Sequence, residues 1–509
     1  MIDGVTIDDL SDLLLEIFDW YLLQAQEEAE AEGYTHINAW HTLVHVCRRW
    51  RTIVFGSPRR LNLHLFFTEG TPIRETLDVW PKTLPIIMWQ SGAKPWDLDD
   101  IIGVLDHNDR ISEINLTSWY IPSLQLVQVL KAMEKPFPAL TDLEIRWQND
   151  EEIDQIDVDL DALIISDSFL GRSVPRLQHL YFSRVPFPRL PELLLSATNL
   201  VCLYLVEIPY HGHFSPEAML NCFSALTNLR IFWLRFESRR RLYNDRVLTH
   251  PIRPVLPRLK VFNFKGDSWY LEILVAPMTS PLLDSLVIIF FHCSILNNPQ
   301  LLQFISRTPN VNPPVEAHVN FSAKTVSVSF PGVLPRKLVL GILSPAHSQL
   351  LSLACVCSSS YPRLVIPAVE RLYLIDNVEP QQDSEDDVED SDDQWREVLS
   401  PFTAVKSLYL SLNLVLRIAD TFQVFGETAT EVFLLPTLRD LYLEAPPNGA
   451  GQEAVIRQFA SIGQFVYARR LANQPIAIHW DRVSEEEPEV DDVGGLPVVD
   501  DSSEVDVIR

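Results

Sequence analysis

Segments of the form LxxLxL recur along this chain of 509 residues, and they constrain its fold more than any other feature of the sequence. Successive segments start 23 to 37 residues apart, except for one gap of 86 residues that follows Leu283. A unit of this length accommodates one strand and a return segment. We therefore expect an α/β solenoid of parallel strands with helices on its outer side. The segments begin at Ile111, Leu140, Leu177, Leu200, Leu229, Leu259, Leu283, Val369, Val405 and Leu438.

The sequence between these segments predicts the helices, and the long gap predicts two further strands. Within the gap, residues 315–321 and 325–330 alternate between apolar and polar side chains, which is typical of strands. This stretched and irregular repeat resembles a degenerate leucine-rich repeat. Helices are predicted over residues 122–133, 215–225, 299–307 and 395–402.

Aromatic side chains occupy the fifth position of LxxLxL in two sets of three units. The fourth and sixth side chains face the core and the third and fifth face the other side of the sheet. Because neighbouring strands lie about 4.8 Å apart, each trio is predicted to form a contiguous aromatic ladder. We hypothesise that the ladders contribute to a surface that binds a protein substrate; the alternative is that the rings only stabilise the sheet. The first trio is Tyr181, Tyr204 and Trp233, and the second is Tyr373, Tyr409 and Tyr442.

A cluster of arginines follows the Leu229 segment. Arg235 lies close to the three consecutive residues Arg239, Arg240 and Arg241. Guanidinium groups on a loop can bind an acidic or phosphorylated segment of a substrate. The alternatives are a solvated loop or a docking site for the acidic segments of the same chain.

The first sixty residues contain two helical patterns. Residues 7–22 place apolar side chains at steps of three and four, whereas residues 24–36 are acidic and polar, as in an exposed connection. A second helical pattern begins at Trp40 and continues to Val54, and Pro58 ends it. Two short amphipathic helices form a small core and leave apolar surface uncovered, so we expect a partner.

The runs LLLEIF at Leu13–Phe18 and LVHVCRRWRTIV at Leu43–Val54, followed by SPRRLNLHL, resemble an F-box. The resemblance is to fungal F-box proteins with a long leucine-rich C-terminal half. It implies docking onto a Skp-type adaptor and, through it, onto the cullin of a ubiquitin ligase. The alternative is that the same side chains form the core of the module itself. The contact residues that the resemblance implies are Leu10, Leu14, Ile17, Phe18, Leu43, Val46, Cys47, Trp50 and Ile53.

The formal net charge is −27, and two segments carry most of the excess. Residues 376–394 contain ten acidic and no basic side chains, and residues 481–509 contain eleven acidic and two basic ones. Both are too charged to be buried and are predicted to be a disordered insertion and tail. The rest of the chain is predicted to comprise an F-box-like module (residues 1–65), a connecting segment or N-terminal cap (66–108), the solenoid (109–375), and the last repeats with a C-terminal cap (395–480).

Composition and motifs argue against several classes of protein. Without the two acidic segments the rest of the chain is still mildly acidic, which is unfavourable for binding nucleic acid. No apolar run reaches the roughly 20 residues that a membrane-spanning helix needs. Six cysteines without a CxxC pair are typical of reduced, buried thiols, which predicts a cytoplasmic and/or nuclear protein. The sequence lacks phosphate-binding loops, GxSxG, HExxH and paired Cys–His patterns, so we expect no metal, no cofactor and no enzymatic activity.

These observations predict a substrate-recognition adaptor of a Skp–cullin–F-box type ubiquitin ligase. The F-box-like module would bind the Skp-type adaptor, and the repeats would bind a protein substrate that the sequence does not identify. The alternative is an interaction scaffold without ligase coupling, because Ser11 stands where the family usually has Pro and the helices are joined by a long acidic connection. An enzyme with an unrecognised site is a third interpretation, and no local motif supports it.

Overall fold

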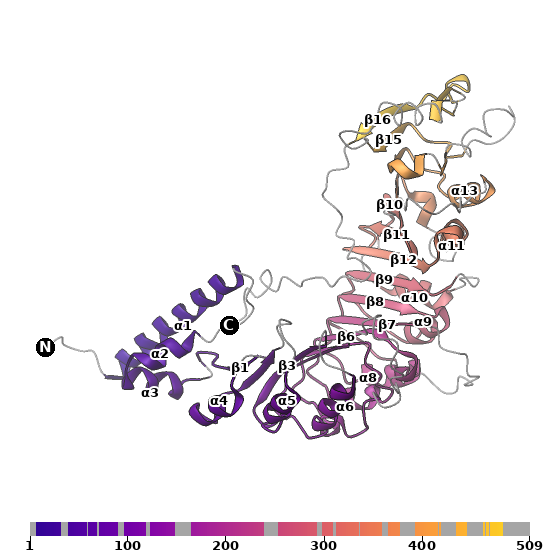
Figure 1. Ribbon diagram of the computed structural model, residues 1–509. Coiled ribbons are helices and arrows are strands. Elements are labelled where there is room, and N and C mark those ends of the chain that lie inside the picture. The colour runs from indigo at the N-terminus through magenta and orange to yellow at the C-terminus, as the bar shows by residue number, and fades with distance from the viewer. Residues whose placement is uncertain are drawn as a thin grey trace. The chain divides into compact units, whose positions relative to one another are not determined.

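The computed structural model of the chain divides into two compact units, which are described separately (Figure 1). Unit 1 comprises Met1–Asn312 and Gly332–Leu343, and unit 2 comprises Pro313–Pro331 and Ser344–Arg509. The structure describes residues 7–31, 39–58, 60–68, 71–89, 96–118, 123–147, 164–238, 253–292, 298–308, 312–334, 336–358, 365–376, 392–415, 417–418, 434–444, 462–463, 465–467 and 469–481.

Unit 1 begins with three helices, α1 (Ile7–Ala31), α2 (Trp40–Val46) and α3 (Arg48–Gly56). Helix α1 extends beyond the predicted range because the Gln, Glu and Ala residues that follow are good helix formers. The prediction of one continuous helix from Trp40 is wrong. The backbone of Cys47 is extended (φ −157°, ψ 167°) and separates α2 from α3. The Trp50 amide donates a hydrogen bond to Cys47 Sγ at 3.5 Å, so this residue caps α3.

The strands of unit 1 form one parallel row, in the order β1 to β9 followed by β12. All seven LxxLxL segments of this unit form strands, as predicted. The strands are β1 (Leu65–Phe67), β2 (Ile86–Trp89), β3 (Ile111–Ser118), β4 (Asp142–Trp147), β5 (His179–Ser183), β6 (Cys202–Ile208), β7 (Ile231–Phe236), β8 (Val261–Gly266), β9 (Ser285–Phe290) and β12 (Lys337–Leu343).

Each repeat contributes side chains to both faces of the sheet in the predicted way. In β4, the fourth and sixth positions of the repeat, Leu143 and Ile145, are buried, whereas Asp142 and Glu144 are half-buried on the other face. Backbone hydrogen bonds join successive repeats at the same position, as where the Lys260 amide donates to the Arg230 carbonyl at 2.8 Å. Equivalent repeat positions therefore pair across neighbouring strands, although the repeats differ in length.

The parallel row begins before Ile111, since β2 and the end of β1 lie within the predicted connecting segment, residues 66–108. These strands are short and lack LxxLxL, so the repeat pattern does not identify them. Helices cover the apolar face of the row, which is visible in Figure 1 for α8 to α10. The helical segments are α4 (Ile73–Val79), α5 (Leu98–Leu105), α6 (Ser123–Ala132), η3 (Phe169–Arg172), α7 (Leu190–Leu194), η4 (Tyr210–Gly212), α8 (Pro216–Phe223), α9 (Ser268–Val275) and α10 (Pro299–Arg307).

Unit 2 contains its own row of strands, in the order β11, β10, β13, β14, β15 and β16. The pair β10–β11 is antiparallel and the other pairs are parallel. Both strands predicted inside the gap are confirmed, but the three-residue connection between them permits only an antiparallel hairpin. The strands are β10 (Glu316–Phe321), β11 (Thr325–Pro331), β13 (Arg371–Asp376), β14 (Ser407–Leu410), β15 (Asp440–Glu444) and β16 (Ala477–Asp481), and the helical segments are η5 (Ala346–Ser348), α11 (Gln349–Ser358), η6 (Ile366–Ala368) and α13 (Asp392–Leu399).

Most of the two predicted acidic segments, residues 377–391 and 482–509, lies outside the described residues. Residues 392–394 begin α13, so the end of the predicted insertion is helical.

The cysteines differ from the expected uniform set of reduced, buried thiols. Cys222 and Cys357 are free and buried, whereas Cys47 is exposed. Cys202 is free and half-buried, and Cys355 is disulfide-bonded. Of the helices in the described ranges, none combines the length and the apolar character that a membrane-spanning segment needs.

Candidate functional site

One face of α1 is apolar and exposed. Leu13, Ile17, Trp20 and Leu23 follow one another at steps of four, three and three, which places them on the same side of the helix. Their exposed fractions are 53%, 48%, 65% and 60%. We call these four residues the α1 stripe. Val46, at the end of α2, is also exposed, so apolar surface is presented by two of the three N-terminal helices.

The opposite face of α1 forms the core of the helical region. Phe18 is fully buried, and its ring centroid lies 4.7 Å from that of Trp50 in α3. Leu15, Leu43 and Val54 are buried as well. The apolar side chains of α1 therefore divide between an internal core and an external surface.

The adaptor-contact residues that the F-box resemblance implies differ in burial in the structure. Phe18 and Leu43 are buried, and Leu14, Trp50 and Ile53 are half-buried, so these five serve the core in whole or in part. Ile17, Val46 and Cys47 are exposed. The side chain of Leu10 lies outside the described residues. The sequence prediction omitted Leu13, Trp20 and Leu23, because an apolar stripe alone does not show which flank of the helix meets the core.

Trp40 connects the N-terminal helices to the start of the sheet. Its Nε1 donates a hydrogen bond to the carbonyl of His64 at 3.0 Å, and its ring centroid lies 5.0 Å from that of Trp80. The His41 ring stacks on the same Trp80 at 4.6 Å. Since His64 precedes β1 and Trp80 follows α4, α2 is attached to the first repeats by an aromatic cluster.

The predicted aromatic ladder in unit 1 is present on the sheet face opposite the helices. The rings of Tyr181 and Tyr204 lie 5.6 Å apart, and those of Tyr204 and Trp233 lie 5.2 Å apart. The Arg146 guanidinium lies over the Tyr181 ring at 4.6 Å. Burial raises the pKa of Tyr181. Trp233 is only 7% exposed, whereas Tyr181 and Tyr204 are half-buried, so these two tyrosines form the more accessible part of the ladder.

The predicted ladder in unit 2 is longer than expected. The Tyr373, Tyr409 and Tyr442 rings stack at 4.0 and 4.2 Å, with interplanar angles of 11° and 9°. His318 stacks on Tyr373 at 4.3 Å, and His479 stacks on Tyr442 at 4.6 Å. We call these five residues the ring column. The sequence prediction omitted both histidines because β10 and β16 do not carry the LxxLxL pattern.

A row of polar side chains occupies the third repeat position on β3 to β6. Glu113, Asp142, His179 and Cys202 are successive partners in the strand register. His179 Nδ1 is hydrogen-bonded to Asp142 Oδ1. Hydrogen bonds to Asp142 and Cys202 raise the pKa of His179 to about 10. Burial, together with the Asp142 charge, raises the pKa of Glu113 to about 7.

Among the described residues, no group of three or more His, Cys, Asp or Glu side chains is arranged to hold a metal ion. Arg239, Arg240 and Arg241 lie outside the described residues. Arg235 precedes them and is buried, and its desolvation lowers its pKa. The described surfaces therefore offer aromatic and apolar contact areas.

The repeating strands, their register and the helices on one face define a solenoid that resembles a leucine-rich-repeat protein. No family model and no curated protein matches the chain. Among solved structures, the chain is similar to the leucine-rich repeat-containing protein LegL7 from Legionella pneumophila, with 11% sequence identity and a TM-score of 0.25, over 78% of this chain and 98% of that protein. The assignment to the class rests on the strand pattern of this chain and not on that similarity.

Proposed function

We propose that this chain is a substrate-recognition adaptor of a Skp–cullin–F-box type ubiquitin ligase. In this proposal the N-terminal helices bind a Skp-type adaptor, which connects the chain to a cullin, and the repeat surfaces bind a protein substrate. The observation that carries the proposal is the exposed α1 stripe, which lies in and just after the F-box-like run at Leu13–Phe18.

The α1 stripe has the character of an interface. Burying a large apolar side chain contributes about 1.5–3 kcal/mol, so four half-exposed side chains on one helix face represent a substantial gain on association. Exposed apolar groups that are contiguous, unlike scattered ones, mark interaction sites. Val46 and Cys47, which lie within the second F-box-like run, Leu43–Val54, are also exposed.

The repeats supply surfaces of the kind that a substrate-binding module needs. The unit 1 ladder and the ring column both consist of rigid rings with polar tips, which combine large contact area with low conformational entropy. Binding a substrate on one part of an adaptor and the ligase on another raises the effective concentration of the substrate near the enzyme. The chain would contribute positioning and no covalent chemistry.

Adaptor binding is tested by changing exposed residues of the α1 stripe. Ile17→Asp and Trp20→Asp each place a charge on the proposed interface, and we expect at least tenfold less co-purification with a Skp-type subunit. Both side chains are about half exposed or more, so thermal stability should change little. Glu16→Gln, at an exposed position next to Ile17, is the control and should retain binding.

Retained adaptor binding in both aspartate variants would contradict the proposed interface. If the full chain captures protein partners and never a Skp-type subunit, the chain is instead an interaction scaffold without ligase coupling. Trp50→Asp is a poorer test, because Trp50 packs against Phe18 and its loss would disturb the core of the helical region.

A further inference from the structure

A row of chemically reactive side chains crosses β4, β5 and β6 on the sheet face opposite the helices. Asp142, His179 and Cys202 occupy the third repeat position of three successive repeats and are partners in the strand register. The third and fifth positions share one face, so Cys202 lies on the same face as Tyr204 of the unit 1 ladder, two residues before it on β6. We call Asp142, His179 and Cys202 the thiol triad.

His179 lies between the other two members of the thiol triad. Its Nδ1 is hydrogen-bonded to Asp142 Oδ1, which leaves Nε2 as the ring nitrogen available to Cys202. Hydrogen bonds to Asp142 and Cys202 raise the pKa of His179 to about 10, so the ring is an imidazolium at neutral pH. An imidazolium beside a cysteine stabilises the thiolate, which is the nucleophilic form of the side chain.

Small reagents can reach the thiol triad. The His179 and Asp142 side chains are 49% and 36% exposed, and Cys202 is half-buried. Cys222 and Cys357 are buried by contrast, and burial raises the pKa of each thiol to about 12. These two thiols therefore stay protonated and shielded, whereas Cys202 combines access with a neighbouring cation.

The backbone beside Cys202 is unsuited to acyl transfer. Such a reaction needs N–H groups that are free to stabilise an oxyanion. The amides of Val201 and Cys202 both donate to the Gln178 carbonyl, at 2.7 and 3.0 Å, so the sheet already uses them. The thiol triad therefore suits a small reagent whose leaving group needs only a proton.

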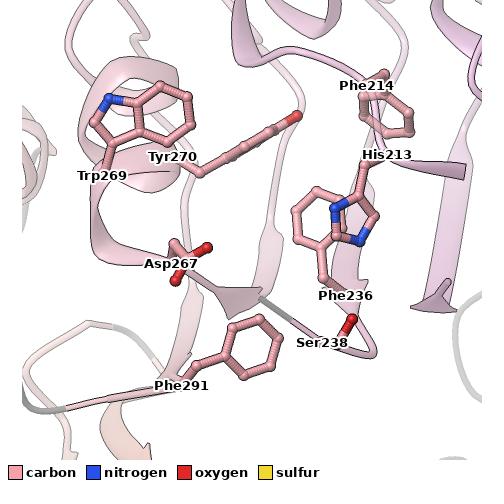
Figure 2. A pocket seen from close by; sticks show the side chains of 8 residues that line it. All are labelled: His213, Phe214, Phe236, Ser238, Asp267, Trp269, Tyr270 and Phe291. Carbon is pink, nitrogen blue, oxygen red and sulfur yellow. The ribbon is translucent and has the colours of Figure 1, made fainter. Parts of the chain in front are cut away.

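The small pocket of unit 1 is separate from the thiol triad. Figure 2 shows this pocket at the carboxyl ends of β7, β8 and β9, where His213, Tyr270 and Phe291 contribute to its wall. None of the described residues that line it is a cysteine, and it has room for about one water molecule. The reagent of the thiol triad is therefore met on the open sheet face and is not enclosed.

We propose that Cys202 is a modification site that hydroperoxides oxidise to a sulfenic acid, with His179 as proton donor and Asp142 as a positioning residue. With hydrogen peroxide, the Cys202 thiolate attacks one oxygen, so that an S–O bond forms and the O–O bond breaks. The sulfur loses two electrons and the peroxide gains them. The departing hydroxide takes the proton from His179 Nε2 and leaves as water. This inference does not depend on the proposed ligase function.

Oxidation is tested by treating the full chain with hydrogen peroxide and dimedone, which traps sulfenic acids, and by quantifying labelled peptides with mass spectrometry. We expect Cys202 to be labelled at least tenfold faster than the buried Cys222 and Cys357. The rate for Cys202 divided by the rate for the exposed Cys47 serves as the measure in every variant. Labelling of Cys202 that is as slow as that of the two buried thiols would overturn the proposal.

His179→Gln removes the imidazolium. An ordinary cysteine is only a few per cent thiolate at pH 7, so the ratio of Cys202 to Cys47 labelling should fall about tenfold. Continued protection of the two buried thiols in the same sample shows that the fold is intact. His347→Gln changes an exposed histidine of unit 2 and should leave the ratio unchanged. A ratio that is the same in His179→Gln and in the unaltered chain would refute the role of His179 and with it the proposal.

Two substitutions at Asp142 test the positioning of the imidazolium. Asp142→Asn removes the charge that stabilises the protonated ring, so the ratio of Cys202 to Cys47 labelling should fall about threefold. Asp142→Glu keeps a carboxylate that can accept from His179 Nδ1 and should retain most of the ratio. Equal losses in the two variants would mean that Asp142 acts on the strand and not through His179, which would overturn its place in the proposal.

Discussion

At the scale of single residues, the polar row across β3 to β6 illustrates how register creates electrostatic coupling. Glu113, Asp142 and His179 are adjacent only because strands from three repeats align. Burial raises the pKa of Glu113 and the Asp142 charge raises it further, whereas the hydrogen bond to Asp142 is the main cause of the raised pKa of His179. The repeat pattern does not reveal this row, because the third repeat position carries a different residue type in each unit.

The His179–Asp142 pair predicts a pH dependence of stability. The pKa of His179 is raised to about 10 in the folded chain, so the folded state retains the proton longer than the unfolded state. The stabilisation is therefore complete below the unfolded pKa of about 6.5 and is lost as pH rises from there toward 10. The side chains are 49% and 36% exposed, which limits the gain to about 0.5–1 kcal/mol.

A double-mutant cycle of His179→Gln and Asp142→Asn measures this coupling by chemical denaturation between pH 5.5 and 9.5. The interaction energy should be largest at the acid end and approach zero at the alkaline end. A coupling energy that is constant, or that grows with pH, is incompatible with an imidazolium–carboxylate pair.

At the scale of elements, predictability follows the length and regularity of the pattern. All ten LxxLxL segments form strands because leucines at fixed spacing are buried wherever a repeat stacks on its neighbours. The short strands β1, β2 and β16 lack that spacing, and their place in the sheet depends on pairing with a neighbouring strand. The break at Cys47 and the antiparallel β10–β11 pair also depend on local backbone conformation, which side-chain periodicity does not encode.

The candidate surfaces were predicted less completely than the strands. Position five of the repeat located both aromatic ladders because strand register is uniform. The contact residues predicted on the first helix include the buried Phe18 and omit the exposed Leu13, Trp20 and Leu23.

The ring column predicts a specific stability difference at its centre. Tyr409 stacks on a ring at each side, and each aromatic pair contributes about 0.5–1.5 kcal/mol beyond burial. Tyr409→Ala should therefore destabilise unit 2 by about 1–3 kcal/mol. Tyr409→Phe retains the stack and should cost less than half as much. Denaturation monitored by tyrosine absorbance and circular dichroism checks this, and equal costs for the two variants would mean that stacking contributes little.

At the scale of the whole molecule, the chain divides into two compact units, and each buries leucines of its own repeats. Leu203 and Leu286 are fully buried in unit 1, and Leu408 and Leu441 are fully buried in unit 2. In solenoids each repeat contacts mainly its neighbours. A mutation that destabilises one repeat therefore lowers the stability of the adjacent repeats more than that of distant ones. The α1 stripe and the unit 1 ladder belong to unit 1, and the ring column belongs to unit 2.

This division predicts how a core defect propagates. Leu203→Ala and Leu408→Ala each create a cavity that costs about 2–5 kcal/mol where it lies. Hydrogen exchange measured by mass spectrometry should show faster exchange in β5 to β7 for the first variant and in β13 to β15 for the second. Strands of the other unit should keep their protection, because their own core is unchanged. Simultaneous loss of protection in both units, from either variant, would show that the chain unfolds as one cooperative body, and the surfaces of the two units would then be energetically coupled.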